Sequence, residues 1–253
     1  MLAKLNRRNF LEVLGQATAA GGLIVLLGPR ATQATTTPED EAYDWEEHSY
    51  VYLIDISKCI GCGSCVRGCK AENDVPDGFY RTWVERYAIA GLEEVRIDSP
   101  QGGLNGFQPD PTAPASTKSF FVPKLCNHCS NTPCVQVCPV GASYQTKDGL
   151  VLVDKDHCVG CGYCVQACPY GSRFLDPETH TAEKCTWCYH RISKGELPAC
   201  VASCPTGTRR FGDLKREGDE VVAIIRSQNV GVLAKELLTK PRCYYLHLDG
   251  EVR

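Results

Sequence analysis

Cysteine places the strongest constraint on this chain, because 17 of its 253 residues are cysteines and they are not scattered. Sixteen of them form four groups of four, and one stands apart. The first and third groups have the spacing C-x2-C-x2-C-x3-C, the second has C-x2-C-x4-C-x3-C, and the fourth has C-x2-C-x11-C-x3-C. In chain order the groups are Cys59, Cys62, Cys65 and Cys69; Cys126, Cys129, Cys134 and Cys138; Cys158, Cys161, Cys164 and Cys168; and Cys185, Cys188, Cys200 and Cys204.

The spacing of the first and third groups is typical of bacterial ferredoxins that bind [4Fe–4S] clusters. Three thiolates from one tight loop hold three irons of a cluster, and the fourth ligand approaches from another direction. The last two cysteines of every group are four residues apart, so we expect them on one face of a helix, with the fourth reaching a second cluster. Proline follows the fourth cysteine in three groups, which suits a helix that ends there, whereas Lys70 follows it in the first.

Structural zinc and disulfides are the two other uses of cysteine that stay open. Zinc sites use separate C-x2-C pairs, which leaves the third cysteine and the C-x3-C-P endings unexplained. Disulfides suit an exported protein, but closely spaced repeats offer no sensible long-loop connectivity. We therefore predict iron–sulfur clusters. The remaining cysteine, Cys243, lies in an apolar Cys-Tyr-Tyr-Leu run and is predicted to be a buried, inert thiol rather than a ligand or sensor.

The second and third groups are predicted to form one two-cluster module, residues 126–169. Between them Ala142–Asp154 reads as a β-hairpin with a turn at Lys147-Asp148-Gly149. Cysteine group, hairpin, cysteine group is the plan of a two-cluster ferredoxin, in which each group sends its fourth cysteine to the other cluster. The predicted ligands are Cys126, Cys129, Cys134 and Cys168 for site c, and Cys158, Cys161, Cys164 and Cys138 for site d.

By exclusion the first and fourth groups pair in an outer module, residues 48–69 with 170–212. Tyr50–Ile56 is β-like and enters the first group, while Thr208–Phe211 leaves the fourth as a short strand that can pair with it. An exchange between the first and second groups remains the alternative. The predicted ligands are Cys59, Cys62, Cys65 and Cys204 for site a, and Cys185, Cys188, Cys200 and Cys69 for site b.

The resulting fold class is α+β: tandem bacterial-ferredoxin-like modules, a duplicated two-cluster ferredoxin with one module inserted in the other, and peripheral loops and helices. Residues 70–125 are an insertion with a β-like stretch at 79–88. Its loop at 99–117 is rich in proline and glycine and is predicted to contact a partner. Residues 213–253 form a C-terminal extension. Helices are expected at 220–227 and 232–239, and a strand at 243–248.

Seven basic residues flank the cysteine groups and suggest a role beside the clusters. A cluster held by four thiolates is anionic, so a nearby cation would raise its reduction potential. Solvated side chains are the alternative for each. The seven are Lys58, Arg67, Lys124, Arg173, Lys184, Arg209 and Arg210.

Residues 1–34 resemble a twin-arginine export signal. Such a signal directs a protein to an export route by which it crosses the membrane already folded. Arg7 and Arg8 precede Phe10-Leu11, and an apolar stretch from Ala17 to Gly28 follows. This stretch is shorter than the ~20 residues that span a bilayer, and no later segment is apolar enough to span. We expect a periplasmic protein at the outer face of the cytoplasmic membrane; whether the segment is cleaved or retained as an anchor stays open.

Several stretches of the sequence resemble the four-cluster iron–sulfur subunits of the molybdopterin oxidoreductase (dimethyl sulfoxide reductase) superfamily. The similarity extends from about Tyr50 to Leu248 and is strongest within residues 55–62, 125–129, 158–170 and 183–188, and residues 197–200 complete the pattern. Within that superfamily it is greatest to exported electron-transfer subunits of tetrathionate and polysulfide reductases, and formate-dependent nitrite reductase has a similar subunit.

The resemblance implies four [4Fe–4S] clusters, one of which could be [3Fe–4S], in a linear wire with the pairing given above. It also implies two partners, a catalytic subunit and an NrfD-like integral membrane subunit that reacts with quinone. The chain shows no evident nucleophile or acid–base pair, so we expect it to carry electrons without catalysing bond chemistry. A multihaem cytochrome in place of the molybdopterin subunit, a free soluble ferredoxin and a zinc-stapled interaction protein are the alternatives. The net charge of −3 gives no indication of nucleic-acid binding.

Overall fold

The structure is a computed structural model that describes residues 43–90, 94–109 and 118–252. These residues belong to one compact unit, Tyr43–Arg253. The predicted export signal at 1–34 lies outside the described residues, as do residues 110–117 of the predicted partner loop. Within the described part of the chain, none of the helices has both the length and the hydropathy needed to cross a bilayer.

The elements are short and mixed, as an α+β fold requires. The strands are β1 Tyr50–Asp55, β2 Thr82–Ala90, β3 Glu94–Asp98, β4 Lys118–Leu125, β5 Ser143–Gln145, β6 Val151–Val153, β7 Arg173–Leu175, β8 Ala182–Lys184, β9 Arg209–Asp213, β10 Val230–Gly231 and β11 Cys243–Leu246. The α-helices are α3 Ser64–Asn73, α4 Pro133–Gln136, α5 Tyr163–Gln166, α6 Tyr189–Ile192, α7 Ala199–Ala202 and α8 Glu220–Ser227. The 3-10 turns are η1 Trp45–Glu47, η2 Ile56–Lys58, η3 Pro100–Gly103 and η4 Lys235–Leu237.

A four-stranded sheet in the order β10-β11-β1-β9 forms the centre of the molecule. Strand β1 pairs antiparallel with β9, with Tyr52 opposite Phe211, and parallel with β11. This confirms the strand pairing predicted between the entry to the first cysteine group and the exit from the fourth. All six residues of β1 are buried, because α8 covers the face with Val51 and Leu53 and the main core covers the face with Tyr52.

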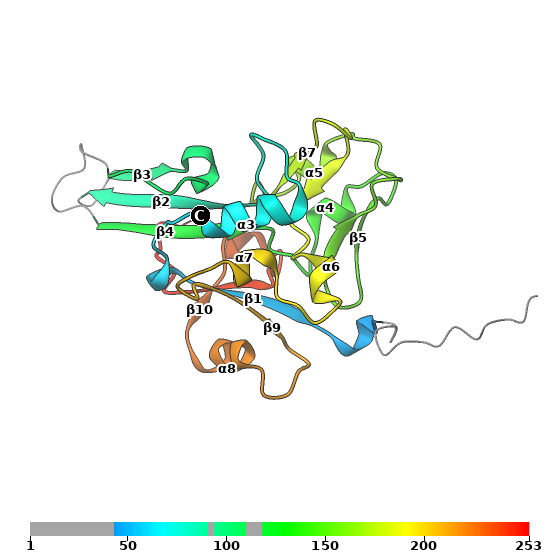
Figure 1. The fold of residues 1–253 in the computed structure, drawn as a ribbon. Coiled ribbons are helices and arrows are strands. Elements are labelled where there is room, and N and C mark those ends of the chain that lie inside the picture. The colour runs from blue at the N-terminus through cyan, green and yellow to red at the C-terminus, as the bar shows by residue number, and fades with distance from the viewer. Residues whose placement is uncertain (1–42, 91–93, 110–117, 253) are drawn as a thin grey trace, which may run out of the picture. The chain divides into compact units, whose positions relative to one another are not determined.

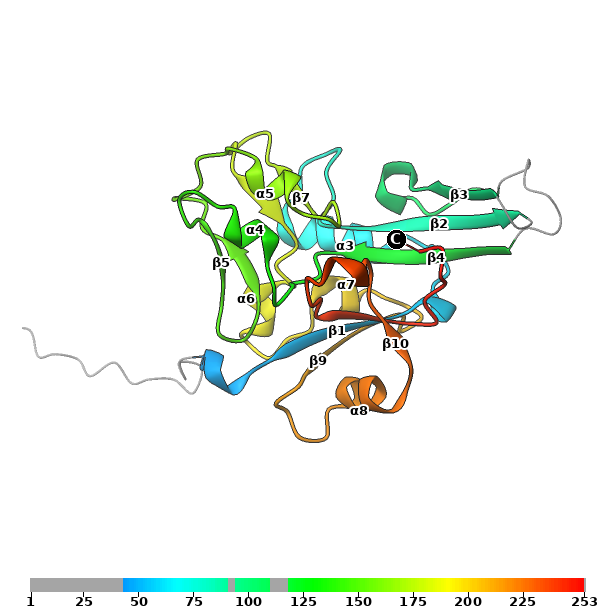
Figure 2. The same ribbon diagram turned by 180° about the vertical axis from the view of Figure 1, so that it is seen from behind.

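Two β-hairpins accompany the second and third cysteine groups. The predicted hairpin is present as β5 and β6, with Ser143 opposite Val153. A second hairpin, β7 and β8, follows the third group, with Arg173 opposite Lys184. Figures 1 and 2 both place α4, α5, β5 and β7 at one end of the molecule and the sheet of β3, β2 and β4 at the other, with α3 and α7 between.

The β-like stretch predicted at 79–88 corresponds to strand β2, which begins at Thr82. The start of the loop predicted to contact a partner packs against the protein itself. Gly102 and Gly103 are buried in η3, and Arg67 Nη1 donates to the carbonyl of Leu104 at 2.6 Å. This part of the loop therefore covers the first cysteine group instead of extending into solvent.

The prediction that the last two cysteines of every group share a helix is wrong for three groups. Only α3 contains both, Cys65 and Cys69. Helices α4, α5 and α7 are single turns that end before the fourth cysteine, because proline follows it and disfavours helical backbone at the residue before. In the first group Lys70 allows α3 to continue to Asn73.

Two of the three elements predicted in the C-terminal extension are present in the structure. Helix α8 has Asp219 as its N-cap, whose side chain accepts from the backbone N–H groups of Val221 and Val222, and strand β11 is present. The helix expected at 232–239 is wrong: only η4 forms there. Ala234 and Leu238 take left-handed backbone conformations on either side of it, which interrupts a helix.

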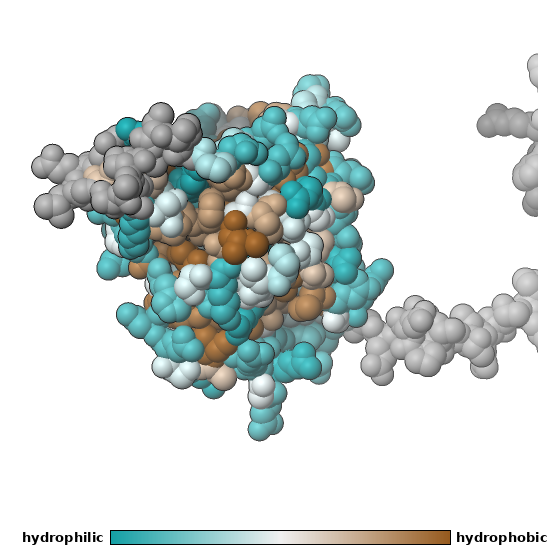
Figure 3. Space-filling view, turned by 60° about the vertical axis from the view of Figure 1, so that its left-hand side comes forward, coloured by the Kyte–Doolittle hydropathy of each residue, from teal (hydrophilic) through white to brown (hydrophobic). Residues whose placement is uncertain are grey.

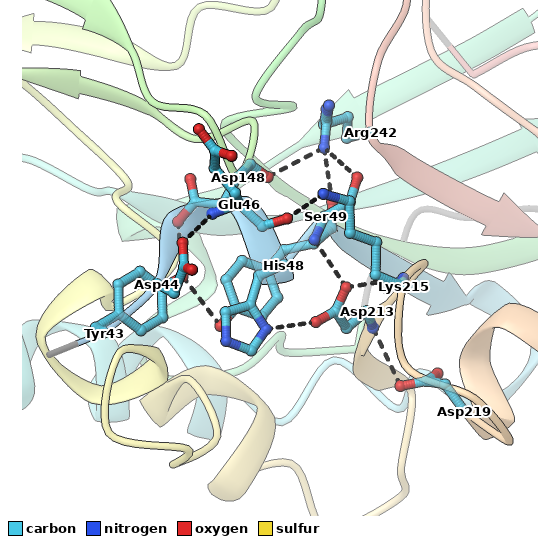
Figure 4. Close-up of polar contacts among 11 residues, drawn as sticks. Tyr43, Asp44, Glu46, His48, Ser49, Asp148, Asp213, Lys215, Asp219 and Arg242 are labelled. Carbon is cyan, nitrogen blue, oxygen red and sulfur yellow. Dashed lines mark hydrogen bonds and ion pairs between the residues drawn. The ribbon is translucent and has the colours of Figure 1, made fainter. Parts of the chain in front are cut away.

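A polar network joins the segment before β1 to distant parts of the chain (Figure 4). The hydroxyl of Tyr43 donates to Asp148 Oδ2 at 2.7 Å, in the turn of the β5–β6 hairpin. His48 Nδ1 lies 2.6 Å from Asp213 Oδ2 at the end of β9. Arg242 donates to the hydroxyl of Ser49 and to the carbonyl of Asp148, each at 3.2 Å. These contacts fix the inner hairpin against the central sheet.

Candidate metal centres

The four cysteine loops share one backbone feature. The residue directly before the second cysteine has a positive φ in every group: +67° at Gly61, +42° at His128, +67° at Gly160 and +53° at Trp187. A left-handed residue at this point reverses the loop so that successive cysteines can face one centre. The sequence indicates this only where the residue is glycine.

The structure brings together sulfur atoms from the first and fourth groups. At site a, the thiol of Cys59 interacts electrostatically with those of Cys65 and Cys204. At site b, the thiol of Cys69 interacts with those of Cys200 and Cys188. Cys185 lies beside the same three thiols. The fourth cysteine of each group therefore lies among cysteines of the other group. Cys62 is the remaining cysteine predicted for site a, and its Sγ lies 3.4 Å from the Ser64 hydroxyl.

The second and third groups also meet. All four cysteines predicted for site c line one small internal cavity, together with Pro133, Tyr170 and Arg173. At site d, α5 carries Cys164 and packs against α4, the helix that precedes Cys138. The four cysteines at the cavity are Cys126, Cys129, Cys134 and Cys168.

Backbone N–H groups surround several of the sulfurs. Burial alone would raise the pKa of Cys138, but N–H groups of residues 140–143 lower it overall, and that of Ser143 lies 3.4 Å from Sγ. The N–H groups of Thr206, Thr208 and Arg209, together with the Thr206 hydroxyl, lower the pKa of Cys204 against the effect of its burial. The N–H of Ala182 donates to Cys158 Sγ at 3.3 Å. Donors aimed at sulfur favour the thiolate, which is the form that binds iron.

Burial differs strongly between the sites. All four cysteines of site b are buried, whereas site d has one buried cysteine, Cys164, and one exposed, Cys161. Burial raises the pKa of Cys185 well above its usual value and that of Cys59 to about 11. Burial disfavours the charged thiolate, so a group that binds at site b must displace thiol protons and supply positive charge.

A ring pair links the second and fourth groups, and no sequence pattern indicates it. His128 and Trp187 are fully buried with ring centres 4.3 Å apart. Trp187 Nε1 donates to the carbonyl of Cys126 at 3.1 Å. The Val151 N–H donates to His128 Nδ1, so His128 Nε2 carries the proton and donates to the carbonyl of Cys185 at 3.0 Å. Each ring thus holds the first cysteine of the other group.

Two polar side chains beside site b were also not predicted. The Tyr52 hydroxyl lies 3.2 Å from Cys200 Sγ. Asn73 Nδ2 lies 3.7 Å from both Cys69 Sγ and Cys188 Sγ. The sequence offered one indication of the position of Asn73. Lys70, rather than proline, follows Cys69, so the helix can continue for the extra turn that contains Asn73.

The donor sets fit iron–sulfur clusters in their chemistry. Each set consists of thiols from cysteine alone, with N–H donors on the sulfurs, as [4Fe–4S] sites require. In residues 43–252, outside the gaps named above, no three His, Cys, Asp or Glu side chains are placed to hold a single metal ion. All 17 cysteines are free of disulfides. Cys243 is fully buried in the central sheet, as expected of an inert thiol.

Of the seven flanking cations, four are buried. Lys58 and Arg67 are exposed and Arg210 is partly exposed. Lys124 Nζ is paired with Glu85 at 2.7 Å. Lys184 Nζ donates to the carbonyl of Cys185 at 2.7 Å. Arg173 and Arg209 lie beside cysteine sulfurs.

Comparison with known proteins agrees with this geometry. Two family models, each described as a 4Fe-4S dicluster domain, match residues 58–142 and 117–214. The B subunit of tetrathionate reductase from Salmonella typhimurium is 40% identical over 248 residues, which are 96% of this chain and 89% of that protein.

Two further relatives are also named as parts of reductases. Thiosulfate reductase electron transfer subunit PhsB of Salmonella typhi is 44% identical over 66% of this chain and 77% of its own. The B chain of polysulfide reductase from Wolinella succinogenes is 37% identical over 77% of this chain and 92% of its own. This protein therefore belongs to the family of ferredoxin-like iron–sulfur subunits of tetrathionate, thiosulfate and polysulfide reductases, and it is an electron-transfer subunit, not a catalytic one.

Proposed function

We propose that the chain holds four [4Fe–4S] clusters at sites a, b, c and d, with the ligand sets predicted from the sequence. The observation that carries the proposal is the position of two fourth cysteines: Cys204 lies with Cys59 and Cys65, and Cys69 lies with Cys188 and Cys200. Site c supports the same scheme, because Cys168 of the third group shares a cavity with three cysteines of the second.

The contacts between neighbouring sites suggest the order a, b, c, d. Cys65 of site a interacts with Cys200 of site b, and Cys185 of site b interacts with Cys126 of site c. Arg173 interacts with Cys134 of site c and with Cys164 of site d. These contacts make each proposed site a neighbour of the next in the series.

The burial of the cysteines along this series suits an electron-transfer chain whose two end sites are accessible from the surface. When bound, each cluster supplies one-electron redox chemistry. The fold buries all four cysteines of the interior site b, whereas Cys161 of site d and the side chain of Ile60 near site a reach the surface. Electrons would therefore enter and leave at sites a and d.

We infer that the chain transfers electrons between an NrfD-like quinone-reactive membrane subunit and a catalytic subunit that contains molybdopterin. The names of its relatives, subunits of reductases, support an assembly of this kind. Apolar side chains beside site d are exposed: Val159 by 65%, Tyr163 by 57% and Val140 by 44%. Figure 3 shows, on a face toward the β2–β3 hairpin, hydrophobic side chains gathered between hydrophilic ones. Such patches are typical of surfaces that meet other proteins.

A multihaem cytochrome in place of the molybdopterin subunit is the second candidate, and a free ferredoxin is the third. Purification of the chain from its native membrane distinguishes them. We expect co-elution with a membrane subunit and with molybdenum. Haem in place of molybdenum would favour the second candidate, and elution of the chain alone would favour the third.

We propose a periplasmic location at the outer face of the cytoplasmic membrane, from the paired Arg7 and Arg8. Replacing both by lysine keeps the charge and removes the guanidinium groups. The variant is expected to accumulate in the cytoplasm with its clusters assembled, whereas the unchanged chain reaches the periplasmic side. Equal distribution of both proteins would contradict export by this signal.

Iron and acid-labile sulfide analysis tests the clusters themselves. Four [4Fe–4S] clusters predict about sixteen iron and sixteen sulfide per chain. EPR of the reduced protein is expected to show interacting clusters. Zinc with no acid-labile sulfide would overturn the proposal, and about fifteen iron with a signal from the oxidised protein would identify one [3Fe–4S] cluster.

A further inference from the structure

The third and fourth cysteine groups are each followed by the same kind of six-residue segment, which begins at the last cysteine and ends in arginine. The third cysteine group ends in Cys-Pro-Tyr-Gly-Ser-Arg at residues 168–173, and the fourth ends in Cys-Pro-Thr-Gly-Thr-Arg at 204–209. Each arginine is the first residue of a strand, Arg173 in β7 and Arg209 in β9. The second group has the related Cys-Pro-Val-Gly-Ala-Ser, which places Ser143 at the arginine position.

Arg173 lies between the two sites of the inner module. Its side chain is buried, with 5% of the residue exposed. Its Nη2 donates to Cys134 Sγ at 3.2 Å and its Nη1 donates to the Ser143 hydroxyl at 2.9 Å. Its charge interacts with Cys134 and Cys126 of site c and with Cys164 of site d.

Arg209 occupies the matching place between sites a and b. It is 2% exposed, and its charge interacts with Cys65 of site a and Cys200 of site b. Each arginine therefore interacts with the third cysteine of both groups at its pair of sites: Arg173 with Cys134 and Cys164, and Arg209 with Cys65 and Cys200.

The polar atoms of Arg209 are not all satisfied by the chain. Nη2 donates to the Thr82 hydroxyl at 2.8 Å, but Nε and Nη1 are buried with no partner among the described residues. Buried donors almost always have an acceptor. The side chain interacts with Cys65 of site a and Cys200 of site b, so the sulfur of a bound cluster is a suitable acceptor.

Neither guanidinium forms an ion pair with a carboxylate of the described residues. The buried Lys124, by contrast, is paired with Glu85. A guanidinium stays charged in a protein, and a buried charge without a counter-charge is strongly unfavourable. The anions within reach are the cysteine thiolates and the clusters that they hold.

Resting on the four-cluster function above, we propose that Arg173 and Arg209 are equivalent charge-compensating residues, one for each pair of sites, that raise the reduction potentials of the two clusters beside them. Reduction adds a negative charge to a cluster, and a fixed cation in a poorly solvated site stabilises the reduced form. Arg173 thus acts on sites c and d, and Arg209 acts on sites a and b.

A redox titration of the full-length chain followed by EPR tests the proposal with Arg173→Gln and Arg209→Gln. Each variant is expected to make reduction of two clusters at least tenfold less favourable, which corresponds to about 59 mV for one electron. The two variants should shift different pairs of signals. Arg173→Lys and Arg209→Lys keep the charge and should shift the potentials less.

Arg210→Gln is the matched control, because Arg210 neighbours Arg209 but pairs with Glu220 at 3.0 Å. Potentials in the Arg209→Gln variant equal to those of this control would overturn the proposal, as would equal shifts of all signals in both glutamine variants. If a glutamine variant loses clusters, a lysine variant that retains them supports the charge role. Loss in both shows a purely structural role and contradicts it. Iron and sulfide in the unchanged chain report separately on the four-cluster function.

Discussion

The loops of the first and third cysteine groups and those of the second and fourth reach the same backbone conformation by different means. In the first pair the left-handed residue is glycine, Gly61 or Gly160; in the second it is a ring, His128 or Trp187. The glycine loops carry sites a and d, each with cysteines that reach solvent. The ring loops carry the first two cysteines of sites c and b, where the modules meet.

The choice between glycine and a ring at the left-handed residue reflects the surroundings of each loop. A side-chain carbon at Gly61 would lie 2.6 Å from the Phe121 ring, and one at Gly160 would overlap the His180 carbonyl oxygen. His128 and Trp187 accept a left-handed conformation that costs roughly 1–2 kcal/mol. Their rings gain burial and two reciprocal hydrogen bonds. The module junction thus depends on two side chains that a ferredoxin spacing does not require.

The largest effect on this comparison is expected from Trp187→Ala. It removes the largest side chain among the fully buried ones, so the free energy of unfolding should fall by about 3–5 kcal/mol. The EPR signals of sites b and c should weaken first, because Trp187 connects them. Thermal unfolding and EPR check this, with the partly exposed Trp45→Ala as control. Equal loss of all four signals would contradict a local role.

Gly160→Ala is expected to destabilise the site d loop by more than the roughly 1–2 kcal/mol of left-handed strain. The added carbon also overlaps the His180 carbonyl. Gly195→Ala is a matched control, because Gly195 has a φ of +76° with open space around it. Thermal unfolding and iron content should show the larger loss for Gly160→Ala. Equal effects would show that strain alone requires the glycine.

Trp187→Phe tests the polar half of the junction. It keeps a ring beside His128 and removes the donor to the Cys126 carbonyl. An unsatisfied buried carbonyl costs about 1–3 kcal/mol, so the expected destabilisation lies below that of the alanine variant. An effect equal to that of Trp187→Ala in thermal unfolding would show that ring packing contributes nothing beyond the hydrogen bond.

Cys243→Ala should have the smallest effect. The side chain is buried in β11 and belongs to none of the proposed ligand sets, so we expect a loss of about 1 kcal/mol from the small cavity. Iron content and all EPR signals should remain unchanged. Loss of a cluster signal would make Cys243 a ligand and would require a new assignment.

The sequence predicted the parts of the fold that short-range patterns determine. The hairpin of β5 and β6 was marked by its turn residues and the pairing of β1 with β9 by two β-like runs. The expected helix through Cys164 and Cys168 was too long, although Pro169 carried the information to end it. In the first group Lys70 takes the place of this proline, so α3 can continue past Cys69 to Asn73.

The site environments were less predictable because they depend on contacts between distant residues. Nothing near Trp187 in the sequence shows that its ring will donate to the Cys126 carbonyl. Seven cations flank the cysteines, but only the fold separates the buried Arg173 and Arg209 from the exposed Lys58 and Arg67. Burial and charge at each site are properties of the assembled modules.

The central claim is that the first and fourth groups exchange their fourth cysteines. Cys204→Ala, compared by EPR with Cys62→Ala and Cys188→Ala in the full-length chain, tests it most directly. The exchange predicts that Cys204→Ala alters the same cluster signal as Cys62→Ala, because both residues belong to site a. If Cys204→Ala instead alters the signal that Cys188→Ala alters, the fourth group keeps its own last cysteine and the exchange is wrong.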